Sequence, residues 1–191
     1  MKNKNKLKCI NELKSIAKSC KNCDLHRNRT NVVFGEGNID SKILFLGEAP
    51  GYLEDKTGKP FVGASGKLLD EMLKEVNILR KDIYICNIVM CRPKNNRRPF
   101  FNELQKCQKY LLTTLLLIKP KIIVTLGKTA ISVLLKRNIY INQYRGNWKT
   151  YFDTLVFPTF HPAYALRHTD KRCIMLDDFK KIKEVYDTLL D

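Results

Sequence analysis

Residues 43–69 read ILFLGEAPGYLEDKTGKPFVGASGKLL, and this stretch decides the fold. It begins with a short apolar run, residues 43–46, which has the length of a strand buried in a sheet. A loop rich in glycine, proline and acidic residues follows, and from Leu68 onward apolar residues recur at helical spacing. A strand, a long loop and a helix in this order are typical of parallel α/β sheets, whose ligands lie outside the carboxyl ends of the strands. Glu48, one residue past the apolar run, is therefore expected at that edge.

The rest of the chain repeats this alternation of strands and helices. An amphipathic helix is predicted over residues 7–19, and further helices begin near Pro99 and Gly127. A last helix has one apolar face, formed by Leu176, Phe179, Ile182, Tyr186 and Leu189. Three more apolar runs have the length of strands, at residues 83–90, 122–126 and 154–157, whereas residues 91–100 and 158–167 are predicted as loops. Strands that alternate with helices imply a parallel sheet covered on both faces, with right-handed crossovers.

The charge of the chain indicates an anionic partner. Lysine and arginine number 35 against 19 acidic residues, a net charge of +16, and nucleic acid is the commonest polyanion that such a surface attracts. The alternative is a solvated, lysine-rich surface. No apolar run approaches the roughly 20 residues of a membrane span, and the basic N-terminus leads into no apolar segment. We expect one intracellular domain, residues 1–191, with a flexible basic segment at residues 1–8 and no membrane partner.

Two glycine motifs resemble phosphate-binding loops but lack required residues. Gly127, Lys128 and Thr129 follow a predicted strand, yet a P-loop also needs a glycine five residues earlier, where this chain has Ile122. The stretch GASGK at residues 63–67 is followed by leucine instead of serine or threonine. An NTPase is therefore not expected.

Four of the seven cysteines have metal-type spacing. Cys20 and Cys23 are separated by two residues, so that both thiolates can face one ion or cluster. Cys91 and Cys107 flank the basic, proline-containing loop and would complete a tetrahedral set. The spacing alone does not separate zinc from an iron–sulfur cluster. The remaining cysteines are interpreted as free thiols: Cys9, Cys86 and Cys173.

Five motifs in order along the chain resemble those of the family 4 uracil-DNA glycosylases, iron–sulfur enzymes of bacteria and archaea. They are GEAPGYLEDKTGKPFVGASGKLL, NIVMCRPKNNRRP, LGKTA, RGNW and PTFHPAYALR. The resemblance implies a three-layer αβα fold around a four-stranded parallel sheet and an enzyme that removes uracil from DNA. It also implies a structural [4Fe–4S] cluster on Cys20, Cys23, Cys91 and Cys107, with zinc as the alternative metal. The implied partner is uracil-containing DNA, single- or double-stranded, bound by a monomer in the cytoplasm at the nucleoid.

Carried over residue by residue, the resemblance assigns roles in the uracil site. Glu48 matches the first catalytic motif and His161 the second. Phe61 matches the ring that stacks on the flipped base, and Asn87 the amide that reads its Watson–Crick edge. Three further residues are expected to line the uracil site: Gly47, Gly51 and Glu54. Gly51 stands where family 1 enzymes place a bulky ring against the thymine methyl group, and Glu54 is the candidate substitute.

The DNA contacts are expected on two segments. The basic loop between the last two cluster cysteines would meet phosphates through Arg92, Lys94, Arg97 and Arg98. The segment after His161 would contribute Ala165, Leu166 and Arg167, although related sequences often have leucine where this chain has Ala165. Two other functions stay open from the sequence: a glycosylase for hypoxanthine or xanthine, and a non-catalytic iron–sulfur module that binds DNA.

Overall fold

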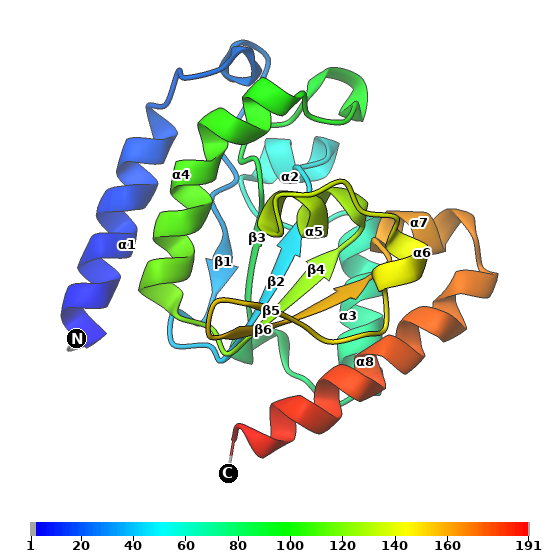
Figure 1. Cartoon of the computed structure of the whole chain (residues 1–191). Coiled ribbons are helices and arrows are strands. Elements are labelled where there is room, and N and C mark those ends of the chain that lie inside the picture. The colour runs from blue at the N-terminus through cyan, green and yellow to red at the C-terminus, as the bar shows by residue number, and fades with distance from the viewer. Residues whose placement is uncertain (1–2, 191) are drawn as a thin grey trace.

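A computed structural model describes residues 3–190, which form one six-stranded sheet with helices on both faces (Figure 1). The strand order is β1-β3-β2-β4-β6-β5. The strand bounds are β1 (Glu36–Gly37), β2 (Ile43–Gly47), β3 (Tyr84–Asn87), β4 (Ile122–Leu126), β5 (Lys149–Tyr151) and β6 (Thr154–Thr159). The four inner strands are parallel, as predicted, whereas β1 and β5 pair antiparallel at the two edges and were not predicted.

The helices complete a three-layer αβα sandwich, which confirms the predicted fold class. Helix α1 packs against α4, on the far side from the sheet, and Figure 1 shows the two running side by side. The helix bounds are α1 (Asn3–Lys18), α2 (Tyr52–Thr57), α3 (Ala64–Glu75), α4 (Phe101–Ile118), α5 (Lys128–Leu134), α6 (Ile141–Tyr144), α7 (Pro162–Arg167) and α8 (Asp170–Thr188), with short 3-10 turns at Asp24–Arg27, Arg80–Asp82 and Lys94–Asn96.

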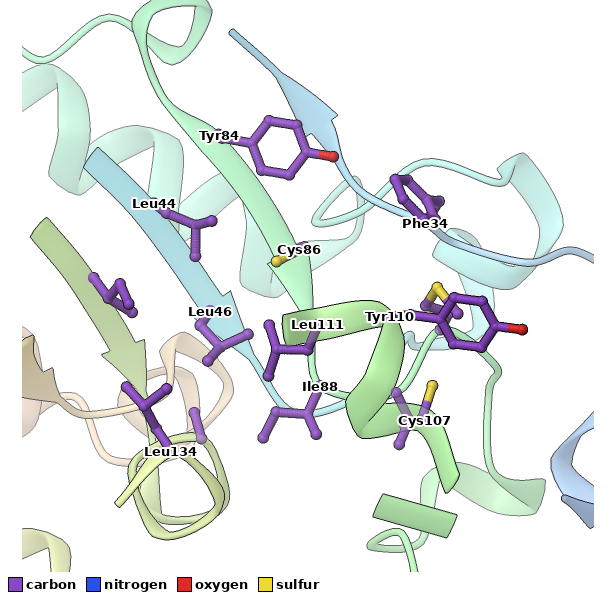
Figure 2. Packing of buried hydrophobic residues seen from close by; sticks show 14 of the residues in the cluster. Phe34, Leu44, Leu46, Tyr84, Cys86, Ile88, Cys107, Tyr110, Leu111 and Leu134 are labelled. Atoms are coloured by element: carbon purple, nitrogen blue, oxygen red, sulfur yellow. The ribbon is translucent and has the colours of Figure 1, made fainter. Parts of the chain in front are cut away.

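Side chains alternate along the inner strands and so feed two apolar layers. On β2, Leu44 and Leu46 face the layer under α4 and α5, together with Leu111 and Leu134 (Figure 2). The intervening residues of the strand pack against α3 and α8 instead. Because both faces are covered, each inner strand is apolar along most of its length, as parallel strands usually are.

Several elements differ from the predictions. Helix α1 begins at Asn3 and not at residue 7, so residues 3–8 of the expected flexible segment are helical; residues 1 and 2 lie outside the described residues. The strand predicted over residues 83–90 ends at Asn87. The expected loops hold α2 and α7, and α7 forms because Pro162 fits its first turn.

A buried ion pair joins the last helix to the sheet. Asp178 of α8 has no exposed surface and accepts hydrogen bonds from the Arg145 guanidinium and, at 2.7 Å, from the Thr159 hydroxyl at the end of β6. Gly146 packs beside the pair, since a Cβ there would lie 3.0 Å from Asp178 Oδ1. The RGNW motif therefore holds the chain just before His161 in place.

No helix in residues 3–190 combines the length and apolarity that crossing a bilayer requires.

We predict that Asp178→Ala lowers the free energy of unfolding by about 3 kcal/mol, because it leaves a largely buried guanidinium without its carboxylate. Denaturant unfolding measures the change. The neighbouring Asp177→Ala is the matched control: Asp177 makes only an exposed pair with Lys180, so its removal should cost less than about 0.5 kcal/mol. Equal stability of the two variants would show that the buried pair contributes nothing.

Candidate active site

A cavity of about 600 Å³ opens at the carboxyl ends of the four parallel strands. Each strand delivers part of its lining: Glu48 follows β2, Asn87 ends β3, Thr129 follows β4 and His161 follows β6. Of the residues predicted from the sequence, the cavity lining includes Glu48, Gly51, Glu54, Phe61, Asn87, Arg97, Arg98, His161 and Arg167. The structure thus brings most of the expected site into one place.

Gly47 allows two side chains of the site to approach the end of β2 closely. It pairs in register with Asn87 on the neighbouring strand. A Cβ at Gly47 would lie 2.3 Å from Asn87 Oδ1 and 2.6 Å from the Phe61 ring. Only glycine leaves room for both side chains, so Gly47 shapes the cavity although it is not among the residues that line it.

The Phe61 ring is positioned by a strained turn. Phe61 has a φ of 52°, in the left-handed region that non-glycine residues seldom adopt. The buried Glu54 carboxylate accepts the next two backbone N–H groups, Val62 at 3.0 Å and Gly63 at 2.8 Å. Arg80 donates to the Phe61 carbonyl at 3.2 Å, and a Cβ at Gly66 would lie 1.9 Å from that oxygen. These contacts fix the backbone on both sides of Phe61.

Asn87 carries an unpartnered polar atom. The residue is only 4% exposed, and among the described residues its Oδ1 has no hydrogen-bond partner. A buried amide oxygen without a partner costs on the order of 1–3 kcal/mol. Because Asn87 lines the cavity, a ligand with an N–H group can satisfy this oxygen.

His161 is held as a neutral imidazole. It caps α7 by accepting the Ala163 N–H on Nδ1 at 3.1 Å, so the ring proton sits on Nε2. Burial, and then the nearby Arg167 guanidinium, lowers the pKa of His161 to about 4. The ring stacks near Phe61, with centroids 6.0 Å apart. His161 is therefore a neutral hydrogen-bond donor at pH 7.

Glu48 has a partner that the sequence analysis missed. The Thr129 hydroxyl, at the start of α5, donates to Glu48 Oε2. Thr129 belongs to the LGKTA motif, and neither that motif nor its likeness to a phosphate-binding loop predicts a contact with Glu48. The available signal was its place directly after a parallel strand, at the same edge as Glu48.

The predicted basic loop differs in role from residue to residue. Lys94 and Arg98 are exposed. Arg97 is instead bound to Glu103 by two hydrogen bonds of 2.9 and 2.7 Å, and it lowers the pKa of that carboxyl. Arg92 donates to Asn96 Oδ1 at 2.7 Å. Arg97 and Arg92 therefore shape the loop in addition to charging it.

The segment after His161 corrects one prediction. Ala165 is completely buried in the core between α3 and α8, because it lies on the inner face of α7, so it cannot meet DNA at the surface. Leu166 is half-buried against the same core. Arg167 is exposed and borders the cavity.

The four predicted ligand cysteines line one small pocket, although they come from the end of α1, the loop after β3 and helix α4. Burial raises the pKa of Cys107 to about 12, and it also raises that of Cys91 despite the Arg29 guanidinium 3.1 Å from its sulfur. Within residues 3–190 no three potential ligand side chains stand close enough to hold a single metal ion. Four thiols that share one pocket form a donor set that suits either an iron–sulfur cluster or a zinc ion.

The other three cysteines lie elsewhere. Cys86 is buried within β3, and burial raises its pKa to about 12. Cys9 is on α1, and Cys173 is exposed on α8. None of the three lines the cysteine pocket, in keeping with their interpretation as free thiols.

Comparison with known proteins identifies the class. The family model of the uracil DNA glycosylase superfamily matches residues 34–190. The chain is 49% identical over 170 residues to the type-4 uracil-DNA glycosylase of Thermotoga maritima, covering 87% of this chain and 88% of that protein. It is 45% identical over 185 residues to the type-4 enzyme of Sulfurisphaera tokodaii (92% and 84% covered) and 44% identical over 176 residues to that of Saccharolobus solfataricus (87% and 82% covered). The chain belongs to the type-4 uracil-DNA glycosylase family, which confirms the resemblance seen in the sequence.

We predict that the His161 imidazole titrates near pH 4, well below the ordinary value of about 6.5. Its signal in an NMR pH titration of the folded protein measures this pKa, and His161→Gln assigns the signal. In the urea-unfolded chain the pKa of the same imidazole should return to about 6.5. Between pH 6.5 and pH 4 the imidazole is protonated in the unfolded chain but not in the folded one. The free energy of unfolding should therefore fall as the pH is lowered through this range. A folded-state pKa near 6.5 would contradict a neutral, half-buried donor.

Proposed function

We propose that this protein is a uracil-DNA glycosylase, which hydrolyses the N-glycosidic bond of uracil in DNA and leaves an abasic site for base excision repair. The observation that carries the proposal is the unpartnered, buried Asn87 oxygen in a cavity that also holds the Phe61 ring and the Nε2–H donor of His161. Membership in the type-4 family supports the same activity.

Base recognition rests on Asn87 and Phe61. The Asn87 amide both accepts and donates, so it can accept the uracil N3–H and donate to O4. Cytosine presents an unprotonated N3 and an amino group at these positions and is mismatched. The target base must leave the DNA stack before it reaches the cavity, and the Phe61 ring offers it a new stacking surface.

The chemistry divides between His161 and Glu48. As the bond from C1′ to N1 breaks, its electron pair leaves with uracil, and the sugar becomes cationic. His161 donates from Nε2 to O2 of the departing base, where negative charge develops. Glu48, oriented by Thr129, holds the water that attacks C1′ and stabilises the cationic sugar. The water adds its hydroxyl to C1′, its proton passes to the Glu48 carboxylate, and uracil leaves with the electron pair of the broken bond.

The surface supplies DNA affinity. The net charge of +16 includes Arg98 and Arg167 at the cavity and the exposed Lys94. These cations would meet phosphates on both sides of the flipped nucleotide. We also propose that the protein acts as a monomer in the cytoplasm, at the nucleoid, where its DNA substrate lies.

A structural [4Fe–4S] cluster is part of the proposal. Cys20, Cys23, Cys91 and Cys107 would hold it as thiolates in their shared pocket. Held by these four cysteines, a cluster would tie the N-terminal segment to the basic loop and to α4. The chain's own contacts support this arrangement: Arg29 donates both to Cys91 Sγ and to the Lys18 carbonyl at the end of α1.

We expect His161→Ala to lower the single-turnover rate of uracil release about 100-fold or more, while affinity for uracil-containing DNA stays nearly unchanged. The reason is that the leaving base carries charge only as the bond breaks. The control is His168→Ala, since His168 is exposed and absent from the cavity lining. If the rate and the affinity fell in proportion, His161 would be a positioning residue.

The wild type itself tests the substrate. Release of hypoxanthine or xanthine but no uracil would show that the proposed substrate is wrong. Release of no base at all would favour a non-catalytic DNA-binding module.

Protein purified without oxygen should be brown and contain iron and sulfide in equal amounts. Cys107→Ser should lose the colour and the iron, because a ligand is missing. Cys173→Ser, which changes an exposed cysteine on α8, should keep both. A colourless protein with one zinc ion per chain would reject the cluster.

A further inference from the structure

Four exposed aromatic side chains lie on segments that line the cavity. Their exposed fractions are 53% for Tyr52, 59% for Phe100, 74% for Phe101 and 66% for Tyr140. They come from three separate segments, and each segment also contributes lining residues: Gly51 and Glu54 beside Tyr52, Arg97 and Arg98 beside Phe100, and Ile141 and Asn142 beside Tyr140. We call these four side chains the aromatic rim. Figure 1 shows α2 and the start of α4 at the end of the molecule toward which β2 points.

Three rings of the aromatic rim have a cation beside them. The Arg97 guanidinium lies 3.8 Å from the centre of the Phe100 ring. Tyr52 has Arg92 at 5.2 Å, and Lys128 lies 5.4 Å from Tyr140. Arg97 and Lys128 themselves line the cavity.

The cations beside two of the rings are held in place. Arg97 is bound to the nearly buried Glu103, which also accepts the Phe100 backbone N–H at 2.7 Å. Arg92 is bound to Asn96, a lining residue. The hydrogen bond from its own N–H to Glu103 thus fixes the backbone of Phe100, while its side chain stays mostly exposed to solvent. Exposed rings that are fixed beside fixed cations form a preorganised surface.

We propose that the aromatic rim binds single-stranded DNA, with the bases next to the flipped uracil stacked on its rings and their phosphates along the adjacent cations. This inference rests on the proposed function for the place of the uracil. Alternating rings and cations are the chemistry of single-strand binding, because every base has a flat face and every nucleotide a phosphate. A duplex offers the cations its phosphates but keeps its base faces stacked on one another. The net charge of +16 favours this polyanion over a neutral apolar partner.

Binding of a uracil-free, single-stranded oligonucleotide tests the aromatic rim directly by fluorescence anisotropy. Phe100→Ala and Tyr140→Ala should each weaken binding about 5- to 150-fold, the range of one lost base stack. The slope of affinity against salt should not change, because neither variant removes a charge. Tyr140→Phe, which keeps the ring, should bind like the wild type.

Phe152→Ala is the matched control. Phe152 is 86% exposed, but it lies in the turn between β5 and β6, at the opposite edge of the sheet from the cavity. Its removal should leave the affinity unchanged. The same binding measurement is repeated with oligonucleotides that carry abasic sites beside the target position. Phe100→Ala and the wild type should bind these with equal affinity, because no base is present to stack on the ring.

Two results would overturn the inference: Phe100→Ala and Tyr140→Ala binding single strands as tightly as Phe152→Ala does, or both variants weakening duplex binding by the same factor. Uracil release by the wild type is measured in parallel, because it tests the proposed function separately. Rim variants that lose single-strand affinity support the aromatic rim even if no uracil is released, and that second result would then reject the glycosylase activity alone.

Discussion

At the end of β2 two side chains, those of Asn87 and Phe61, pack directly against the backbone of Gly47. Any residue with a Cβ at this position would clash with both. A Cβ there would meet the Asn87 amide and the Phe61 ring at 2.3 and 2.6 Å, so the missing side chain creates the place where a base can be read and stacked. The register of the parallel pair sets this contact, since Gly47 lies opposite Asn87. The pairing of β2 with β3 thus fixes the position of the Asn87 amide. The loop that follows β2 folds back and places the Phe61 ring beside that amide.

Buried acids hold that loop and connect it to the cysteine segment. Glu54 accepts the backbone N–H groups that follow Phe61, and its neighbour Asp55 accepts the Thr30 N–H at 2.9 Å, close to the cysteine pocket. Glu103 of α4 and Asp178 of α8 each bind an arginine. Several of the 19 acidic residues are therefore structural. Glu48 differs from them because, among the described residues, its carboxylate accepts a hydrogen bond only from the Thr129 hydroxyl.

Sequence periodicity was sufficient for the four parallel strands and the long helices, because each buries a continuous apolar face. It could not predict β1, which has two exposed residues, or β5, which is only partly buried; both exist because they pair with a neighbouring strand. Glu48, Asn87 and His161 each lie at or just after the carboxyl end of a parallel strand, so the sheet brings them to the same edge. The burial of Ala165, the bonding of Arg97 to Glu103 and the Thr129 contact depend on tertiary packing, which the spacing of residues does not encode.

In the proposed mechanism, the Gly47 contact presents Asn87 and Phe61 to one base while His161 faces its O2 atom. A crystal structure of the protein with free uracil checks this arrangement. We expect uracil stacked on the Phe61 ring, with N3–H and O4 bonded to the Asn87 amide and O2 within hydrogen-bond distance of His161 Nε2. Uracil bound outside the cavity, or inside it with the Asn87 amide still unpartnered, would rule this arrangement out.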